Sequence, residues 1–330
     1  MTLSPGALAA GLIELGTATA TTRNDACTIH QIGNYDLPSE CGGALMPPSA
    51  WITLRVRPSL LGAAVVAHGE AASGMMPSLY VYSVDGRLAH RVLVHSQDDA
   101  ERLAAFGRSR VPGVTRPDAA AVVFAESPAE EVPVASSRAG VLAALDTSLP
   151  EWSWVDAAGW RGGDLLAQLD AVLGETCLER YAALRDGDRG QDLSRRAKDD
   201  RWGVGSVGSS RGVDCAVVSA VFEHLASVGM SVCVGVPSSS VMQLSAGRVH
   251  VVERVGSLIV VSLGEGIVEL DLAALRSCLV VTSSGPLGST STLELYDEGS
   301  RCVAVLTQLG LVGADVHRAW EHMLESLPPV

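Results

Sequence analysis

Two stretches of this chain carry the same pattern of apolar residues. Residues 52–94 align with residues 266–308 without a gap, at a constant offset of 214 positions. Because a fixed period is the signature of a repeated structural unit, the sequence predicts two tandem copies of one unit. The identical pairs are Leu61 and Leu275, Val66 and Val280, Gly74 and Gly288, Leu79 and Leu293, Tyr82 and Tyr296, and Arg87 and Arg301.

Within each copy the local pattern is mainly that of β-strands. In the second copy Leu293 and Leu295 alternate with Glu294, which is the period-two pattern of a half-buried strand. In the first copy Asp85-Gly86 separates two apolar runs and predicts a β-hairpin. We therefore predict the α+β class, with two tandem structural repeats that are each a large twisted antiparallel β-sheet with flanking helices. The helices are expected at residues 5–15, 97–106, 215–228 and 314–327.

The chain divides into three parts at its changes of composition. Residues 1–110 form the first repeat, and residues 111–150, rich in Pro, Ala and Glu, are predicted to be a linker. Residues 151–330 form the second repeat. It begins with a segment of helical pattern at 162–184 and continues into a charged, glycine-rich stretch at 185–212, which we expect to be an exposed loop.

Charge and composition exclude several classes of function. The net charge of −13 opposes binding to nucleic acid and to an anionic membrane surface. No apolar run approaches the ~18 residues of a transmembrane helix. No basic residue of a secretory signal precedes Arg23, and the seven cysteines are scattered as expected of free thiols in a reducing compartment. We expect a cytoplasmic protein with no nucleic-acid partner and no stable membrane insertion.

Two short motifs match catalytic patterns but lack the context that the chemistry needs. Residues 203–208 fit the dinucleotide fingerprint G-x-G-x-x-G, which requires a buried strand before it and a helix after it. The charged run at 195–200 cannot be that strand. Residues 208–212 fit the nucleophile pattern G-x-S-x-G, but Asp214 and His224 follow too closely to be its usual partners. We therefore assign no catalytic residue.

Several segments resemble a known family in order and spacing. The chain is similar to the HemS/ChuS/HmuS-type hemin-degrading and heme-trafficking proteins over nearly its whole length, and we expect a diverged member. The matching segments are Thr22-Arg23-Asn24, Ile29-His30-Gln31-Ile32-Gly33-Asn34-Tyr35, Trp51-Ile52-Thr53-Leu54-Arg55, Ser291-Thr292-Leu293-Glu294-Leu295-Tyr296, and residues 232–247.

The resemblance implies a cytoplasmic heme-binding protein in heme and iron utilisation. Proteins of this family hold heme between their two halves, pass it to a heme oxygenase, and in some cases degrade it. The implied cofactor is heme, and the implied partners are a heme oxygenase or a heme importer. Such a site needs a neutral imidazole for the iron, cationic groups for the propionates or a distal water, and an apolar slot.

Carried over position by position, the resemblance keeps some of these groups and loses others. Arg55 falls on the family's distal arginine, and His30 falls on a histidine considered a secondary heme ligand. His68 falls on a family lysine and is a further candidate ligand. The principal axial histidine is replaced by Ala167, which cannot ligate iron. The other replaced positions are Thr282 and Ser283 for a basic pair, Thr307 for a tyrosine and Gly310 for an arginine.

Two hypotheses of different class follow. In the first, the chain binds heme at an atypical site that uses His30 or His68 on the iron and Arg55 on the distal side. In the second, it no longer binds heme and serves as a non-catalytic binding or interaction module. His30 is then a strand-end histidine bonded to backbone, and Arg55 a solvated or ion-paired strand residue. The sequence leaves open whether bound heme is degraded or only carried.

Overall fold

The computed structural model describes residue 8 and residues 11–35, 51–68, 77–108, 206–285, 288–308 and 314–330. The predictions for the linker at 111–150, the helical segment at 162–184, and Ala167 lie outside these residues. The described part is an antiparallel, β-rich α+β fold with few helices, so the predicted class is confirmed.

In the described residues of the first half there are six strands and the helix α2, with a 3-10 turn between β3 and β4. The strands are β1 (Ala18–Arg23), β2 (Cys27–Tyr35), β3 (Trp51–Val56), β4 (Leu61–His68), β5 (Pro77–Ser83) and β6 (Leu88–Val94), the helix α2 is Gln97–Arg108, and the turn is Pro58–Leu60. Residues 11–13 are also helical, within the helix predicted at 5–15.

The part of the second half that the structure describes contains eight strands and two α-helices. They are β7 (Ser206–Val213), α7 (Val218–Val228), β8 (Ser231–Pro237), β9 (Val241–Val255), β10 (Leu258–Leu263), β11 (Gly266–Asp271), β12 (Leu275–Gly285), β13 (Gly288–Asp297), β14 (Cys302–Thr307) and α8 (Ala314–Ser326). Two 3-10 turns, Cys215–Val217 and Leu272–Ala274, precede α7 and β12.

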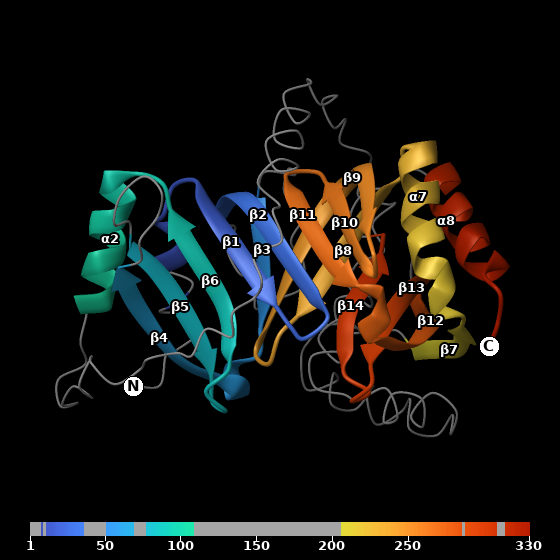
Figure 1. Cartoon of the computed structure of the whole chain (residues 1–330), viewed down its shortest axis with the longest axis horizontal. Helices are drawn as coiled ribbons and strands as arrows, with labels where there is room; N and C mark the ends of the chain where they lie inside the picture. The colour runs from blue at the N-terminus through green and yellow to red at the C-terminus, as the bar shows by residue number, and fades with distance from the viewer. Residues whose placement is uncertain are drawn as a thin grey trace.

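The fourteen strands of the described residues belong to one hydrogen-bonded sheet. Its order is β4-β5-β6-β1-β2-β11-β10-β9-β8-β14-β13-β12-β7. β3 pairs with both β2 and β9, so that β2, β11, β10, β9 and β3 close into a ring in the middle of the molecule. The structure thus differs from two separate sheets, because strands from each half pair across the junction (Figure 1).

Strand pairing follows the same register in both halves. The β4–β5 pair shifts register between Leu61 and Ala63, and the β12–β13 pair shifts between Leu275 and Ser277. Each residue of the second pair lies 214 positions after its counterpart in the first. The junction obeys the same relation, since His30 of β2 pairs with Ile267 of β11 while Leu244 of β9 pairs with Thr53 of β3.

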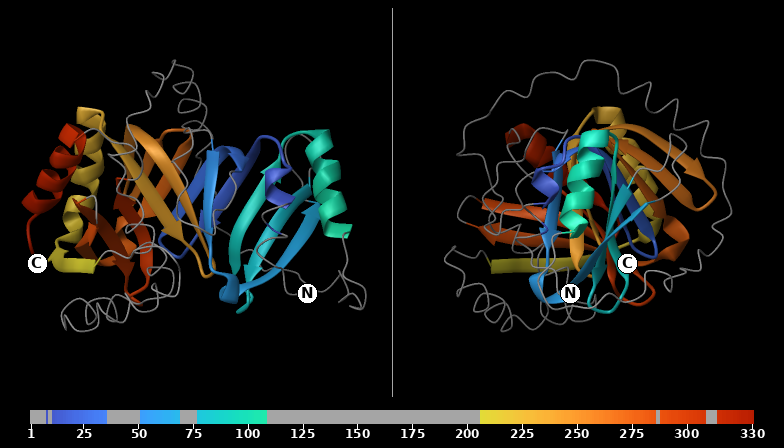
Figure 2. Two further views of the ribbon diagram at one scale, coloured as in Figure 1. Left: turned by 180° about the vertical axis from the view of Figure 1, so that it is seen from behind. Right: turned by 90° about the vertical axis from the view of Figure 1, so that its left-hand side faces the viewer.

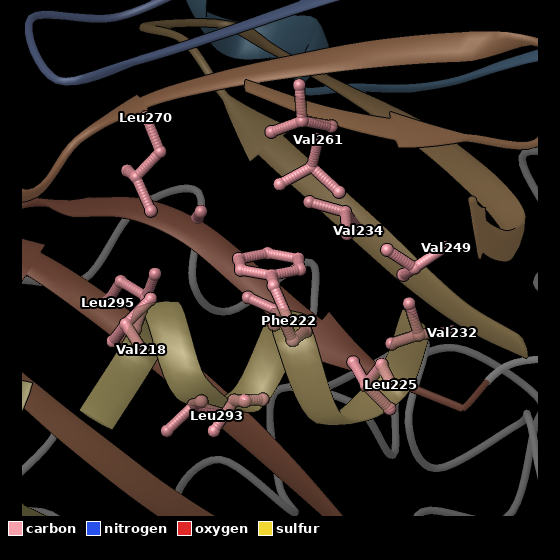
Figure 3. Close-up of a cluster of buried hydrophobic side chains, with 14 of the residues drawn as sticks. Val218, Phe222, Leu225, Val232, Val234, Val249, Val261, Leu270, Leu293 and Leu295 are labelled. Atoms are coloured by element: carbon pink, nitrogen blue, oxygen red, sulfur yellow. The ribbon is translucent and has the colours of Figure 1, made fainter. Parts of the chain in front are cut away.

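Each half buries one face of its sheet under helices. In the first half, Leu8, Leu12 and Leu103 pack with strand residues into one core. In the second half α7 presents an apolar stripe to the sheet and ends at Gly229, whose positive φ of 63° suits glycine. Figure 3 shows this stripe beside the strands, and Figures 1 and 2 show that the helices lie at opposite ends of the molecule. The stripe consists of Val218, Val221, Phe222 and Leu225.

One predicted loop is partly a strand. Residues 206–212 of the glycine-rich stretch at 185–212 belong to β7, an edge strand of the sheet that pairs with β12. The Arg211 guanidinium also donates to the carbonyls of Leu324 and Leu327, at 2.6 and 2.8 Å. The prediction was wrong there because a strand on a sheet edge takes its hydrogen bonds from a distant partner and needs no apolar alternation of its own. Gly208 of the G-x-G-x-x-G match therefore lies in a strand, not at the start of a helix.

Candidate functional site

A cleft of about 1410 Å³ lies at the junction of the two halves. Turns from both halves form its walls: the β1–β2 and β5–β6 turns of the first half, and the β8–β9 and β13–β14 turns of the second. These turns correspond at the 214-residue offset, so the cleft lies where equivalent parts of the two halves meet. We refer to it as the junction cleft.

The junction cleft is rich in charge of both signs. The guanidinium of Arg301 bridges Asp25 and Asp297, at 2.6 and 2.9 Å, and thereby links the β13–β14 turn to the β1–β2 turn. The same two carboxylates contribute to the raised pKa of Arg301 against the opposing effect of desolvation. The lining arginines are Arg23, Arg57, Arg87, Arg91 and Arg301, and the lining carboxylates are Asp25, Asp85, Glu269, Asp271 and Asp297.

Asn24 holds the two halves together at the base of this cleft. Its Nδ2 donates to the carbonyl of Pro237 at 2.7 Å and to that of Val303 at 2.8 Å. Its Oδ1 accepts from the backbone N–H groups of Ala26 and Cys27, at 3.0 and 2.8 Å. One side chain therefore closes the β1–β2 turn and satisfies two carbonyls of the opposite half.

His30 lies on the wall of the junction cleft, in the middle of β2. Its neighbours Ile29 and Gln31 are buried, whereas His30 is half-buried on the opposite face of the strand. His30 Nδ1 lies 3.0 Å from Thr21 Oγ1 on β1. With Thr21 as acceptor, Nδ1 carries the proton and Nε2 keeps the lone pair, which is the tautomer that ligates iron through Nε2.

A row of facing side chains crosses the sheet through His30. Ile267, His30, Thr21, Arg91 and Tyr80 occupy paired positions on five adjacent strands. The Arg91 guanidinium lies over the Tyr80 ring, 5.4 Å from its centroid, in a cation–π contact. Since neighbouring strands are about 4.8 Å apart, Arg91 lies about 10 Å from His30. We refer to these residues as the His30 row.

Arg55 lies elsewhere. On β3 it pairs with Met242 of β9, and it does not line the junction cleft. β2 and β3 run parallel with Asn34 opposite Trp51, which places His30 and Arg55 about eight residues, or roughly 26 Å, apart along the strands. A distal arginine has to lie within one side-chain length of a bound iron. The structure therefore does not bring His30 and Arg55 to one heme.

The face beside Arg55 is a buried apolar surface with one carboxylate in it. Met242 and Leu244 of β9 are buried there, and Thr307 lies on the same face. Glu294 is fully buried and accepts a hydrogen bond from Tyr296 Oη at 2.6 Å. We refer to this surface as the Arg55 face. Its apolar members are Cys233, Met242, Leu244, Leu279, Val281, Tyr296, Cys302 and Val305.

The His30 row and the Arg55 face occupy equivalent positions of the two halves. His30 corresponds to Leu244, Thr21 to Gly235, and Arg91 to Val305 at the offset of 214. One half thus carries imidazole, hydroxyl and guanidinium groups where the other carries aliphatic side chains or none. Of the family positions discussed above, Thr307 and Arg55 lie on the aliphatic side.

The third candidate, His68, ends β4, where it pairs with Pro77. Its side chain lies outside the part that the structure describes. β4 is separated from β2 by β5, β6 and β1, so the backbones of His68 and His30 lie four strands apart in the sheet.

Sequence reasoning missed a buried polar network around His90, one of the residues that line the junction cleft. The ring of His90, 1% exposed, has Nδ1 at 2.8 Å from Thr22 Oγ1 and Nε2 at 2.8 Å from Tyr35 Oη. Thr22 Oγ1 donates to Gln243 Oε1 of the other half at 2.9 Å. Burial lowers the pKa of His90 to about 3, so the ring is neutral. These contacts join residues 68, 55 and 221 positions apart, so no local sequence pattern predicts them.

Among the described residues, no group of three or more His, Cys, Asp or Glu side chains is arranged to hold a metal ion. None of the helices in the described ranges is long and apolar enough to cross a membrane.

Comparison with known proteins identifies the fold. No protein-family profile matches the sequence, and no curated protein matches it. Holo-PhuS, a heme-binding protein from Pseudomonas aeruginosa, matches with a TM-score of 0.61 at 18% identity, over 98% of this chain and 85% of PhuS. The heme degrading enzyme ChuS of Escherichia coli O157:H7 matches with a TM-score of 0.62 at 17% identity, over 98% of this chain and 84% of ChuS. The chain has the PhuS and ChuS fold, and the predicted resemblance is confirmed at that level.

Proposed function

We propose that this chain is a diverged heme-utilisation protein that binds heme in the junction cleft, with His30 as the ligand of the iron. The observation that carries the proposal is the position of His30: it lies on the wall of a large cleft, its ring held by Thr21, in a chain that shares its fold with PhuS and ChuS. Bound heme would supply its iron as the binding and redox centre.

The His30 row supplies the remaining groups that a heme requires. Arg91 lies about 10 Å from His30, a span comparable to that from the iron of a heme to its propionates. The guanidinium of Arg23 lines the same cleft, and Tyr80 and Val65 extend the row with apolar surface. Each charge-assisted hydrogen bond to a propionate contributes about 1.5–3 kcal/mol.

The duplicated architecture is part of the same proposal. The offset of 214 that relates Leu61 to Leu275 also relates the strand boundaries, the register shifts and the junction pairing. Two copies of one unit would give two equivalent faces, the His30 row and the Arg55 face. We propose that the heme ligand is on the former, because the family's axial histidine is replaced by Ala167 and the Arg55 face is filled with buried side chains.

Cytoplasmic heme trafficking is the role that fits this proposal, with a heme oxygenase or a heme importer as the partner. Whether the bound heme is also degraded depends on a supply of electrons and oxygen, which turnover with a reductant would test. A second candidate is a non-catalytic binding module without heme. The five carboxylates that line the junction cleft favour it, because they oppose the propionates.

A hemin titration of the purified protein, followed at the Soret band, separates these functions. We expect saturable one-to-one binding that His30→Ala weakens strongly. His95→Ala is the matched control, because His95 is an exposed histidine on the same side of the sheet with a similar contact, Nε2 to Thr19 Oγ1 at 2.8 Å. Arg91→Ala should weaken binding about 10- to 100-fold, whereas Arg254→Ala, an exposed arginine on β9, should not.

Arg55→Ala and His68→Ala complete the series. Weaker hemin binding in Arg55→Ala with no effect of His30→Ala would place the heme on the Arg55 face and overturn the proposed location. If only His68→Ala weakened hemin binding, the iron ligand would be His68 on β4 and not His30. Binding no stronger than that of an unrelated control protein would exclude the heme function and leave the binding module.

A further inference from the structure

Two cysteines of the second half, neither of which lines the junction cleft, lie in contact. The Sγ atoms of Cys215 and Cys278 are 2.7 Å apart. This separation is shorter than the contact distance of two non-bonded sulfur atoms and approaches the ~2.05 Å of a disulfide bond. Cys215 begins the 3-10 turn ahead of α7, and Cys278 lies on β12.

The backbone around both sulfur atoms is held in place. Val213, two residues before Cys215, pairs directly with Cys278 across the β7–β12 ladder. Asp214 donates its N–H to the carbonyl of Pro328 and accepts from the N–H of Ala216 with its side chain, at 3.2 and 2.9 Å. The two sulfur atoms therefore meet because the fold positions them, and bond formation requires a small movement of side chains.

We propose that Cys215 and Cys278 form a reversible disulfide, a redox modification site at the outer edge of the second half. The oxidant that we propose for this site is a peroxide such as hydrogen peroxide. Cys215 is the attacking thiol, because it is partly exposed while Cys278 is 1% exposed. The hydrogen bond from Cys278 also lowers the pKa of Cys215, which favours its thiolate.

The reaction balances as a two-electron oxidation. The Cys215 thiolate attacks one peroxide oxygen, the O–O bond breaks, and the departing hydroxide takes a proton to leave as water. Cys215 is then a sulfenic acid. The sulfur of Cys278 attacks the sulfur of Cys215, the S–O bond breaks, and the second hydroxide leaves with the Cys278 proton as another water. A dithiol reductant reverses the bond by exchange.

The other described cysteines are poorly placed for this chemistry. Cys27 and Cys233 are buried, and desolvation raises the pKa of both thiols, that of Cys233 to about 12. Cys302 is buried as well, with its sulfur 3.5 Å from the Ala304 carbonyl. These residues supply internal controls in the same chain.

The test is peroxide treatment of the reduced full-length protein, followed by thiol blocking, digestion and mass spectrometry. We expect a cross-linked pair of peptides that contain residues 215 and 278, a loss of two hydrogens, and recovery of both thiols with dithiothreitol. Because Cys215 and Cys233 share a tryptic peptide, the assignment uses Cys215→Ser and the matched Cys233→Ala. The cross-link should be lost in the first variant and kept in the second.

Oxidation should also raise the melting temperature of the wild-type protein. The bond joins residues 63 positions apart, and closing a loop of that size raises Tm by about 5 °C in a chain of this length. Three results would overturn the proposal. They are a cross-link that persists in Cys215→Ser, a cross-link that joins other cysteines, and the absence of any cross-link in the wild type. If a variant fails to fold, the presence or absence of the cross-link in the wild-type protein still tests the proposal.

Discussion

At the scale of single residues, His90 shows what a buried neutral imidazole contributes. Its two nitrogens are bonded to Thr22 and Tyr35, and its low pKa of about 3 follows from burial. A histidine in the unfolded chain has a pKa of about 6.5. Between these two values the unfolded state binds a proton that the folded state does not, so stability rises with pH. The contribution is complete above about pH 6.5 and is lost as the pH falls toward 3.

We therefore predict that His90→Gln reduces the loss of stability on acidification. Glutamine can bond Thr22 and Tyr35 but does not titrate. Between pH 6 and pH 4 the free energy of unfolding of the wild type should fall more steeply than that of the variant, by about 1.4 kcal/mol per pH unit. Urea unfolding at several pH values measures the difference, with His95→Gln as the exposed control. Parallel curves for wild type and His90→Gln would contradict the account.

Residue-scale chemistry was only partly accessible from the sequence. His30 and Arg55 could be found from the resemblance, but their separation could not, because it depends on the register of β2 against β3. The hypothesis without heme expected His30 at the end of a strand, whereas it lies in the middle of β2. Glu294 alternates with two leucines, a pattern that places it in water, yet it is fully buried and bonded to Tyr296. Whether the second face of a strand is buried depends on the elements that cover it, and the sequence of the strand alone does not indicate which elements do.

At the scale of elements, the strands were predictable wherever turn chemistry marked their ends. The hairpin around Asp85-Gly86 lies where it was predicted, with Gly86 at a φ of 81°. Its counterpart turns at Ser300, which reaches a φ of 58°. The backbone N–H of Ser83 bonds the Arg87 carbonyl, and that of Asp297 bonds the Arg301 carbonyl, both at 3.0 Å. β7 could not be predicted, because its stability comes from pairing with β12.

The β9–β10 hairpin depends on a close backbone approach at Gly247. A Cβ there would lie 2.8 Å from Gly264 Cα and 2.9 Å from Gly264 N. Both are backbone atoms, so the clash cannot be relieved by rotating a side chain. We predict that Gly247→Ala lowers the free energy of unfolding by about 1–3 kcal/mol. Chemical denaturation measures it, with Ser257→Ala in the exposed turn of the same hairpin as the control. A loss no larger than that of the control would show that the two backbones can separate.

At the scale of the whole molecule, two strand pairings across the junction join the two halves. β2 of the first half pairs with β11, and β9 of the second half pairs with β3. Asn24 reinforces this junction, since its amide bonds the carbonyls of Pro237 and Val303. The tandem repeat stays a prediction from the sequence. The pairing across the junction could not be predicted, because the offset between two segments does not determine how their strands pair.

Asn24→Asp tests the junction directly. The carboxylate would face two carbonyl oxygens that now receive hydrogen bonds, and it has no proton to offer them at neutral pH. We predict a loss of about 2–4 kcal/mol in the free energy of unfolding. Asn34→Asp is the matched control, because Asn34 is exposed on β2, where its Oδ1 accepts a hydrogen bond from the Thr17 hydroxyl at 3.2 Å. Equal effects of the two substitutions would show that Asn24 does not join the halves.

The proposed heme site is also a property of the whole molecule, since both halves wall the junction cleft. Rescue with imidazole tests most directly whether His30 provides the iron ligand. In His30→Gly, added imidazole should enter the vacated space, restore the Soret position of the wild-type hemin complex and strengthen hemin binding. His95→Gly should bind hemin as the wild type does, and added imidazole should change neither its Soret position nor its hemin affinity. Wild-type binding by His30→Gly, or an equal imidazole effect in both variants, would contradict ligation by His30.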